Sequence, residues 1–389
     1  MTKLEELIQE LCPEGVEYKE ISEVTNYEQP SKYIVKSTAY HDEYEIPVLT
    51  AGQSFVLGYT DESDGVYPAS KATPVIIFDD FTAAFKWVVF PFKVKSSAMK
   101  IITAKEDSLL IRFLFHWMGV LNYSSTEHTR LWIGTYSKFR IPVPPLPVQH
   151  EIVRILDNFT ELTAELTAEL TARKRQYAYY RDKLLHNDAT TVYKRLGDFC
   201  DLLSGFPFDS SKFKEDGIRL MRGMNIKRGY LDFTEENNRY WESTDGVEKY
   251  LLNDQDIVIS MDGSLVGSSY GMVSKKDLPL LLVQRVTRIR TNQANIRYVY
   301  HYIASGRFTE YVHKKKTAGA IPHISLKDIS NFEVPLPSLE VQKRLVEVLD
   351  NFDSICTDLN IGLPAEIEAR QKQYEYYRDK LLTFREISN

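Results

Sequence analysis

The chain has 389 residues, of which 43% are hydrophobic and 26% charged, and its formal net charge is −6. This length favours two globular domains over one, and the composition is typical of a folded soluble protein. The absence of an eighteen-residue apolar run and of a signal-peptide-like start excludes a membrane-spanning helix and a secreted protein, so we expect a cytoplasmic location. Cys12, Cys200 and Cys356 lie far apart without a CxxC pair, which indicates reduced, partly buried thiols and excludes a zinc site or a disulfide framework.

In chain order, the predicted elements form two globular segments, each followed by a long helix. Residues 1–147 combine short β-type runs with glycine and aspartate turns, and a helix is expected near 107–121. Residues 190–337 repeat this pattern, with one helix near 295–312. The long helices occupy 148–189 and 338–389.

Charge is unevenly distributed between the two globular segments. Residues 1–147 carry 14 basic and 19 acidic side chains, whereas residues 190–337 carry 21 basic and 18 acidic ones. Only the second segment is therefore basic. If a chain with this balance binds DNA tightly, partner proteins must supply much of the phosphate neutralisation that drives affinity.

The long helices carry apolar side chains at alternating spacings of three and four, which indicates a coiled-coil seam with four-residue insertions. Pro147 is suited to the first turn of the first helix. The tetrad 163–166 is repeated at 167–170, and the second helix has Gly362-Leu363-Pro364 in place of this tract, where we expect a kink. A helix of about 38 residues is about 57 Å long and needs a partner helix. Antiparallel pairing of the two long helices is favoured, and dimerisation through two separate coils is the alternative.

The two halves of the chain form an internal repeat. Asp157-Asn158-Phe159 recurs as Asp350-Asn351-Phe352, and each copy follows a Val-Gln pair and a proline-spaced strand. The tail QYAYYRDKLL at 176–185 recurs as QYEYYRDKLL at 373–382. A fainter parallel relates 112–117 to 297–302 and includes His116 and His301, which we interpret as packed side chains and not as metal ligands.

Duplicated proline-led helices that end in QYxYYRDKLL, each behind a variable domain, resemble the specificity subunits of Type I restriction-modification systems. The segment 320–325, which leads into 334–337, is also similar to that family. The resemblance covers nearly the whole chain. It implies an α+β fold in which two α/β target-recognition domains, 1–147 and 190–337, are separated by antiparallel coiled-coil helices, 148–189 and 338–389, with pseudo-two-fold symmetry.

The resemblance also implies a non-catalytic subunit of an adenine methyltransferase and endonuclease complex. Such a subunit reads a bipartite, asymmetric target in double-stranded DNA and docks two modification subunits, with two restriction subunits in complexes that cleave. S-adenosylmethionine, ATP and Mg are then expected on the partners and none on this chain. The sequence agrees, because it contains no GxxxxGK[ST] or GxGxxG motif. A stand-alone DNA-binding or architectural protein with a coiled-coil spacer, and an enzyme with an unrecognised site, are the alternatives.

Candidate DNA contacts are basic, amide and hydroxyl side chains near turns, since arginine and asparagine can make paired hydrogen bonds to guanine and adenine. A lysine run at 314–316 suits phosphates, and a solvated charge run is the alternative there. In the second segment the candidates are Arg219, Arg222, Asn225, Lys227, Arg228, Ser264, Gln284, Lys314, Lys315 and Lys316. In the first segment they are Gln53, Ser54, Lys71, Lys86 and Lys138.

Candidate partner contacts lie in the repeated tails, because tyrosine and arginine are typical anchors of protein interfaces. They are Tyr177, Tyr179, Tyr180, Arg181, Tyr374, Tyr376, Tyr377 and Arg378. A structural seam between the helices would explain the same repetition.

Overall fold

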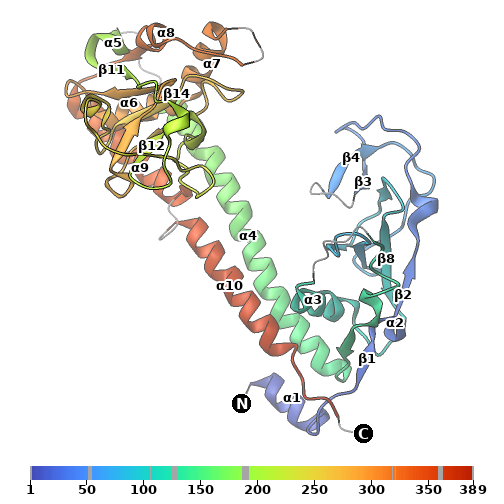
Figure 1. Ribbon diagram of the computed structural model, residues 1–389. Helices are drawn as coiled ribbons and strands as arrows, with labels where there is room; N and C mark the ends of the chain where they lie inside the picture. The colour runs from blue at the N-terminus through green and yellow to red at the C-terminus, as the bar shows by residue number, and fades with distance from the viewer. Residues whose placement is uncertain are drawn as a thin grey trace. The chain divides into compact units, whose positions relative to one another are not determined.

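The computed structural model describes residues 2–50, 55–105, 107–123, 129–185, 192–317, 319, 321–357 and 362–387. The chain divides into two compact units (Figure 1). The first contains Met1–Thr167 and Glu366–Asn389, and the second contains Ala168–Ala365. Each unit thus combines one globular segment with parts of both predicted long helices. The sequence predicted four consecutive segments, 1–147, 148–189, 190–337 and 338–389. The two compact units instead group the parts of the chain that pack against each other.

The first unit is built on β-structure that is antiparallel except for the parallel pair β3 and β7. Strands β1 (Tyr18–Glu20) and β9 (Arg140–Pro142) pair at the base of the domain. A four-stranded sheet has the order β2-β8-β5-β6, with β2 (Thr25–Glu28), β8 (Met99–Ala104), β5 (Val75–Asp79) and β6 (Phe85–Val88). A three-stranded sheet has the order β4-β3-β7, with β4 (Val56–Thr60), β3 (Ile46–Leu49) and β7 (Lys93–Val94). The short helices are α1 (Lys3–Leu11), α2 (Ile21–Val24), α3 (Ile111–Leu121), η1 (Pro30–Tyr33) and η2 (Tyr136–Lys138).

The second unit repeats this topology strand for strand, which confirms the internal repeat. The base pair is β10 (Tyr193–Arg195) with β18 (Glu333–Pro335). The larger sheet has the order β11-β17-β14-β15, with β11 (Asp201–Ser204), β17 (Val286–Arg290), β14 (Ile257–Ser260) and β15 (Tyr270–Met272). The smaller sheet has the order β13-β12-β16, with β13 (Tyr240–Trp241), β12 (Ile218–Met221) and β16 (Leu280–Leu282). Short helices are α5 (Leu196–Phe199), α8 (Leu326–Ser330), η3 (Ser210–Lys212), η4 (Gly223–Asn225), η5 (Glu248–Tyr250) and η6 (Lys275–Asp277).

The single helix predicted near 295–312 is two helices, α6 (Ile296–Ala304) and α7 (Gly306–Lys315). They meet at Ser305, whose backbone is extended, with φ −72° and ψ 156°. Its buried hydroxyl donates to the carbonyl oxygen of Tyr302 at 2.6 Å. Serine commonly bonds to nearby backbone in this way and so competes with helix continuation.

The first long helix, α4 (Leu146–Leu184), is continuous over 39 residues and has Pro147 in its first turn, as predicted. The second is divided into α9 (Leu339–Thr357) and α10 (Leu363–Leu381), on either side of residues 358–361, which lie outside the described ranges. Pro364 sits in the first turn of α10, where a missing backbone N–H leaves no helical bond unmade.

The two long helices pair with each other within the chain. In the first unit, α10 runs antiparallel to the beginning of α4 (Figure 1). The rings of Phe159 and Tyr377 stack there with centroids 5.3 Å apart. In the second unit, the end of α4 meets α9, where Tyr180 stacks on Phe352 with centroids 6.2 Å apart. No helix within the described ranges combines the length and apolar character required to cross a membrane.

The main core of each unit lies between the larger sheet, the long helices and one helix of the globular domain, α3 in the first unit and α6 in the second. We call α3 and α6 the domain helices. In the first unit it includes the fully buried side chains of Phe113, Trp132 and Tyr136, and the end of α10 contributes Leu382. In the second unit Tyr298 and Phe308 are buried, together with Leu185 at the end of α4. Each core is therefore completed by the tail of the helix that follows the other globular segment.

Candidate DNA interface and helix surface

A buried histidine joins the domain helix of the first unit to both long helices. His116 Nε2 lies 2.9 Å from an oxygen of Asp157 on α4, and Nδ1 lies 3.0 Å from the hydroxyl of Tyr374 on α10. Arg112 completes the cluster with a 2.7 Å bond to Asp157. Burial lowers the pKa of His116 in spite of the opposing hydrogen bond to Asp157. A neutral ring then donates from Nε2 to the carboxylate and accepts at Nδ1 from the tyrosine.

The second unit contains the same cluster with the helices exchanged. His301 lies 2.7 Å from an oxygen of Asp350 on α9 and 3.2 Å from the hydroxyl of Tyr177 on α4. Arg297 donates to both carboxylate oxygens of Asp350. Burial raises the pKa of Asp350, but hydrogen bonds from His301 and Arg297 outweigh it and bring the pKa to about 2. The prediction that His116 and His301 are packed side chains is confirmed.

The repeated Val-Gln pairs also serve the domain helices. Gln149 is buried, and its side-chain oxygen accepts from Leu110 N at the start of α3, at 2.8 Å. Its nitrogen donates to the carbonyl oxygen of Pro144 at 2.7 Å. Gln342 is buried in the second unit and accepts from Asn295 N, next to α6, at 2.9 Å. The residues that are repeated in the two long helices are therefore the ones that form hydrogen bonds to the globular domains.

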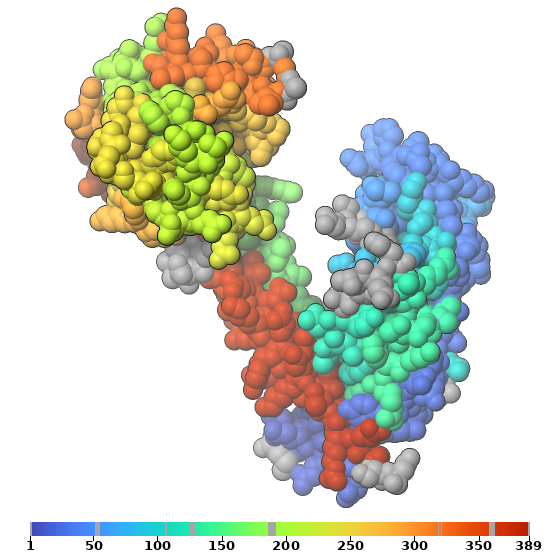
Figure 2. Space-filling model, in the orientation of Figure 1, coloured from blue at the N-terminus to red at the C-terminus, as the bar shows by residue number. Residues whose placement is uncertain are grey.

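The eight candidate partner contacts fall into two groups. Tyr177 and Tyr374 belong to the histidine clusters, and Arg181 and Arg378 lie over those two rings, 5.3 and 5.7 Å from the centroids. Tyr180 and Tyr377 stack between helices. The most exposed members are Tyr179 and Tyr376, each 62% accessible. The α10 surface, red in Figure 2, is uncovered in that view.

The candidate DNA contacts of the second unit differ widely in accessibility. Asn225 is fully buried: its side chain accepts from Arg222 N at 3.1 Å and donates to the carbonyl oxygens of Asp232 and Asn237. It maintains the turn, so we correct its assignment as a base contact. Arg219, half-buried, lies 4.6 Å from the ring centroid of Phe233. The other half-buried members are Arg222, Lys227 and Lys316, and the exposed ones are Arg228, Ser264, Gln284, Lys314 and Lys315.

Two matching backbone hydrogen bonds identify equivalent loop positions in the two units. In the second unit, Met261 N–H donates to Arg285 O and Ile324 N–H donates to Met261 O. In the first unit, Asp80 N–H donates to Ala98 O and Leu131 N–H donates to Asp80 O. All four N···O distances are between 2.8 and 3.0 Å. The frame is thus shared, whereas the side chains that it presents differ.

The comparison with known proteins identifies the family. A family model described as the Type I restriction modification DNA specificity domain matches residues 13–173 and again 189–369. The chain belongs to this family. The EcoR124I/EcoR124II specificity subunit of Escherichia coli is 42% identical over 384 residues, covering 95% of this chain and 94% of that one. A putative type I specificity subunit of Haemophilus influenzae is 29% identical, with 95% and 96% covered.

Solved structures share the fold of this specificity subunit. The S subunit of a type I system from M. genitalium superposes with a TM-score of 0.58 at 13% identity, covering 95% of this chain and 96% of that one. A chain from a study of assembly and conformational transition in a type I R-M system gives a TM-score of 0.59 at 18% identity, covering 96% and 98%. These likenesses agree with the expected α+β fold.

The candidate DNA contacts in the first unit of the specificity subunit are only partly described. Gln53 and Ser54 lie outside the described residues. Lys71, Lys86 and Lys138 are exposed. Two other lysines of this unit form ion pairs with carboxylates of the same unit. Lys100 is buried and pairs with Asp80 at 3.1 Å, and Lys93 pairs with Glu62 at 3.1 Å.

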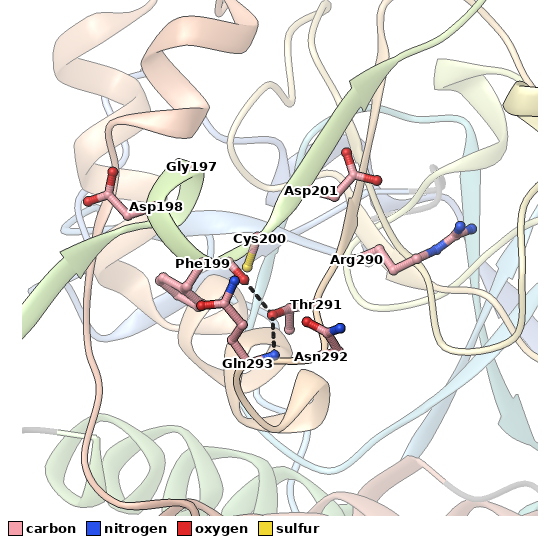
Figure 3. Close-up of a pocket in the computed structure, with 9 residues that line it drawn as sticks. All are labelled: Gly197, Asp198, Phe199, Cys200, Asp201, Arg290, Thr291, Asn292 and Gln293. Carbon is pink, nitrogen blue, oxygen red and sulfur yellow. Dashed lines mark hydrogen bonds between the residues drawn. The ribbon is translucent and has the colours of Figure 1, made fainter.

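A pocket of about 480 Å³ opens beside the end of β17 in the second unit (Figure 3). Thr291 in this pocket donates its hydroxyl to the carbonyl oxygen of Phe199 at 2.5 Å. Burial raises the pKa of the Cys200 thiol, which also lines the pocket, to about 12, so this sulfur is a poor nucleophile. Cys12, Cys200 and Cys356 are all free thiols, and they are buried where partial burial was expected. No group of metal-binding side chains occurs in the part of the chain that the structure describes.

We predict that Tyr374→Phe lowers the free energy of unfolding by about 1 kcal/mol, because it removes the buried hydroxyl that bonds to His116. Tyr376→Phe, two residues along the same helix, removes an exposed hydroxyl and should change stability by less than about 0.5 kcal/mol. Urea denaturation of both variants measures the difference. Equal effects would show that the hydroxyl of Tyr374 does not support the cluster.

Proposed function

We propose that this specificity subunit reads a bipartite, asymmetric target in double-stranded DNA, one half-site with each globular domain. The observation that carries the proposal is that the two domains repeat the same strand order and loop hydrogen bonds, whereas the side chains on their loops differ. A homodimeric reader presents the same residues twice and therefore selects a palindrome. In this chain the aligned loop positions carry different side chains in the two units, so the two half-sites should be unrelated in sequence.

Affinity for that target depends in part on the rest of the complex. The chain has a net charge of −6, and several of its basic side chains are held in internal ion pairs. Phosphate neutralisation is the main source of non-specific affinity for DNA. We therefore propose that modification subunits contribute much of the positive surface. S-adenosylmethionine, ATP and Mg belong to the partners in this proposal, and the complex acts in the cytoplasm.

The helix tails are the proposed docking sites for two identical modification subunits, and two restriction subunits join in complexes that cleave. The support is that the most exposed tyrosine of each repeated tail, Tyr179 or Tyr376, stands at the same position. Their neighbours are engaged in the histidine clusters or in stacking between helices. Exposed aromatic side chains of this kind are frequent anchors in protein interfaces.

The proposed function predicts a split methylation motif. When the chain is co-expressed with its modification subunit, N6-methyladenine should occur genome-wide at two unrelated half-sites with a fixed gap, as mapped by single-molecule sequencing. Replacing residues 1–147 or 190–337 by the corresponding segment of a relative should change one half-site only. A stable complex without any new methylation would instead favour an independent DNA-binding protein.

The continuous helix α4 predicts how the gap is set. Inserting one further Thr-Ala-Glu-Leu unit after Leu170 adds about 6 Å of helix, which corresponds to nearly two base pairs of DNA. The same methylation map should show the gap wider by one or two base pairs and both half-sites unchanged. An altered half-site with a fixed gap would contradict this geometry.

The docking proposal predicts that Tyr179→Ser and Tyr376→Ser together weaken binding of the modification subunit by about tenfold or more, since each removes an exposed aromatic anchor. Affinity should be measured without DNA. Tyr230→Ser, which changes a tyrosine that is 60% exposed in the second domain, is the matched control and should leave affinity unchanged. Wild-type affinity of the double variant would place the docking surface elsewhere.

A further inference from the structure

Three loop segments of the second unit are bound side by side. They are 261–265 after β14, 283–285 between β16 and β17, and the described residues 317, 319 and 321–324 after α7. Gly263 N–H donates to Pro322 O at 3.1 Å, and Thr317 N–H donates to His323 O at 2.9 Å. Together with the Met261 bonds already described, these contacts give the loops one defined arrangement. We call this set the Asp262 loop cluster.

Arg285 occupies an unusual position in the Asp262 loop cluster. It lies in a turn closed by Val286 N–H on Val283 O at 3.2 Å, and its φ is +63°. This left-handed conformation favours glycine, and arginine adopts it at a cost in free energy. The segment around Gly205 packs tightly against this turn, because a Cβ atom on Gly205 would lie 2.1 Å from Val283 O. The strained residue is also accessible, because 66% of the Arg285 side chain is exposed.

Asp262 holds Arg285 and His323 at the same time. One oxygen of its carboxylate accepts from Arg285 Nη1 at 2.5 Å, and the other is bonded to His323 Nδ1. Burial raises the pKa of Asp262, but the hydrogen bonds from His323 and Arg285 outweigh it and keep the pKa below its usual value. The contact uses a single terminal nitrogen of Arg285, so the remaining guanidinium donors are directed elsewhere on an exposed side chain.

The equivalent positions of the first unit carry different chemistry. The matched backbone bonds make Ala98 the equivalent of Arg285. By chain order from the matched residues, Phe81 is then equivalent to Asp262 and Arg130 to His323. At these described positions, the arginine and the carboxylate that supports it therefore occur in the second domain and not in the first. A role in forming the common frame would require them in both. Their restriction to the second unit is what a residue that distinguishes the second half-site should show.

We propose that Arg285 reads a guanine in the half-site of the second domain and that Asp262 and His323 are positioning residues for it. Arginine commonly makes two hydrogen bonds to the O6 and N7 atoms of guanine in the major groove. A carboxylate that restrains the guanidinium before binding reduces the entropy lost on contact. This inference rests on the proposed function, because it assigns one base position within the predicted split motif.

The test compares methylation by the complete complex for wild type, Arg285→Ala, Arg285→Lys and Lys314→Ala. Arg285→Ala should relax discrimination about tenfold or more at one base pair of the second half-site, leaving the first half-site and the gap unchanged. Arg285→Lys retains charge without the planar fork and should relax the same position. Lys314→Ala, a change of an exposed lysine, should lower methylation uniformly across sequences without relaxing any position.

Asp262→Asn tests positioning separately. It removes the charge that restrains Arg285 and should relax the same base position by a smaller factor, while methylation still requires the first half-site unchanged. The role of Arg285 would be overturned if the wild type gave a split motif and both Arg285→Ala and Arg285→Lys gave the same motif without relaxation at any base. Uniform loss across all four bases would also overturn it, because it indicates a phosphate contact. Failure of the wild-type complex to give a split motif would count against the proposed function instead.

Discussion

The buried histidine in each unit is the interaction on which the arrangement of the chain depends. His116 and His301 each bond to an aspartate of one long helix and to a tyrosine of the other. Neither bond can be replaced by water without exposing a fully buried ring. Each domain core is therefore completed only when the two long helices pair within the chain, which disfavours separate coils that dimerise on their own.

These polar clusters also solve a problem of register. The tetrad repeat in the middle of α4 presents nearly the same apolar stripe after a shift of four residues, so packing of that stripe discriminates poorly between registers. A buried hydrogen-bonded network is satisfied in only one register, because a displaced histidine or aspartate would be left without its partner. The clusters at the ends of the helices thus specify the alignment that the tetrads leave open.

The division of labour between repeated and diverged residues follows from this arrangement. Glutamine, aspartate and tyrosine recur in both long helices because each long helix forms the same hydrogen bonds to the domain helices. The loops are held by backbone hydrogen bonds, which are insensitive to side-chain identity. Side chains at the loop positions can therefore change without loss of the frame, which is the usual route by which binding specificity varies on a constant scaffold.

The sequence alone determined the internal repeat, the long helices, the buried histidines and the family, because helical periodicity and duplicated motifs are properties of the linear chain. Only the tertiary structure decided that Asn225 is consumed by its own turn, that Tyr177 and Tyr374 serve the cores while Tyr179 and Tyr376 remain exposed, and that Asp262, Arg285 and His323 meet. Asp262 and His323 are 61 positions apart, and Arg285 has a left-handed backbone that its residue type does not favour. Side-chain direction in loops depends on such long-range contacts, and no local pattern encodes them.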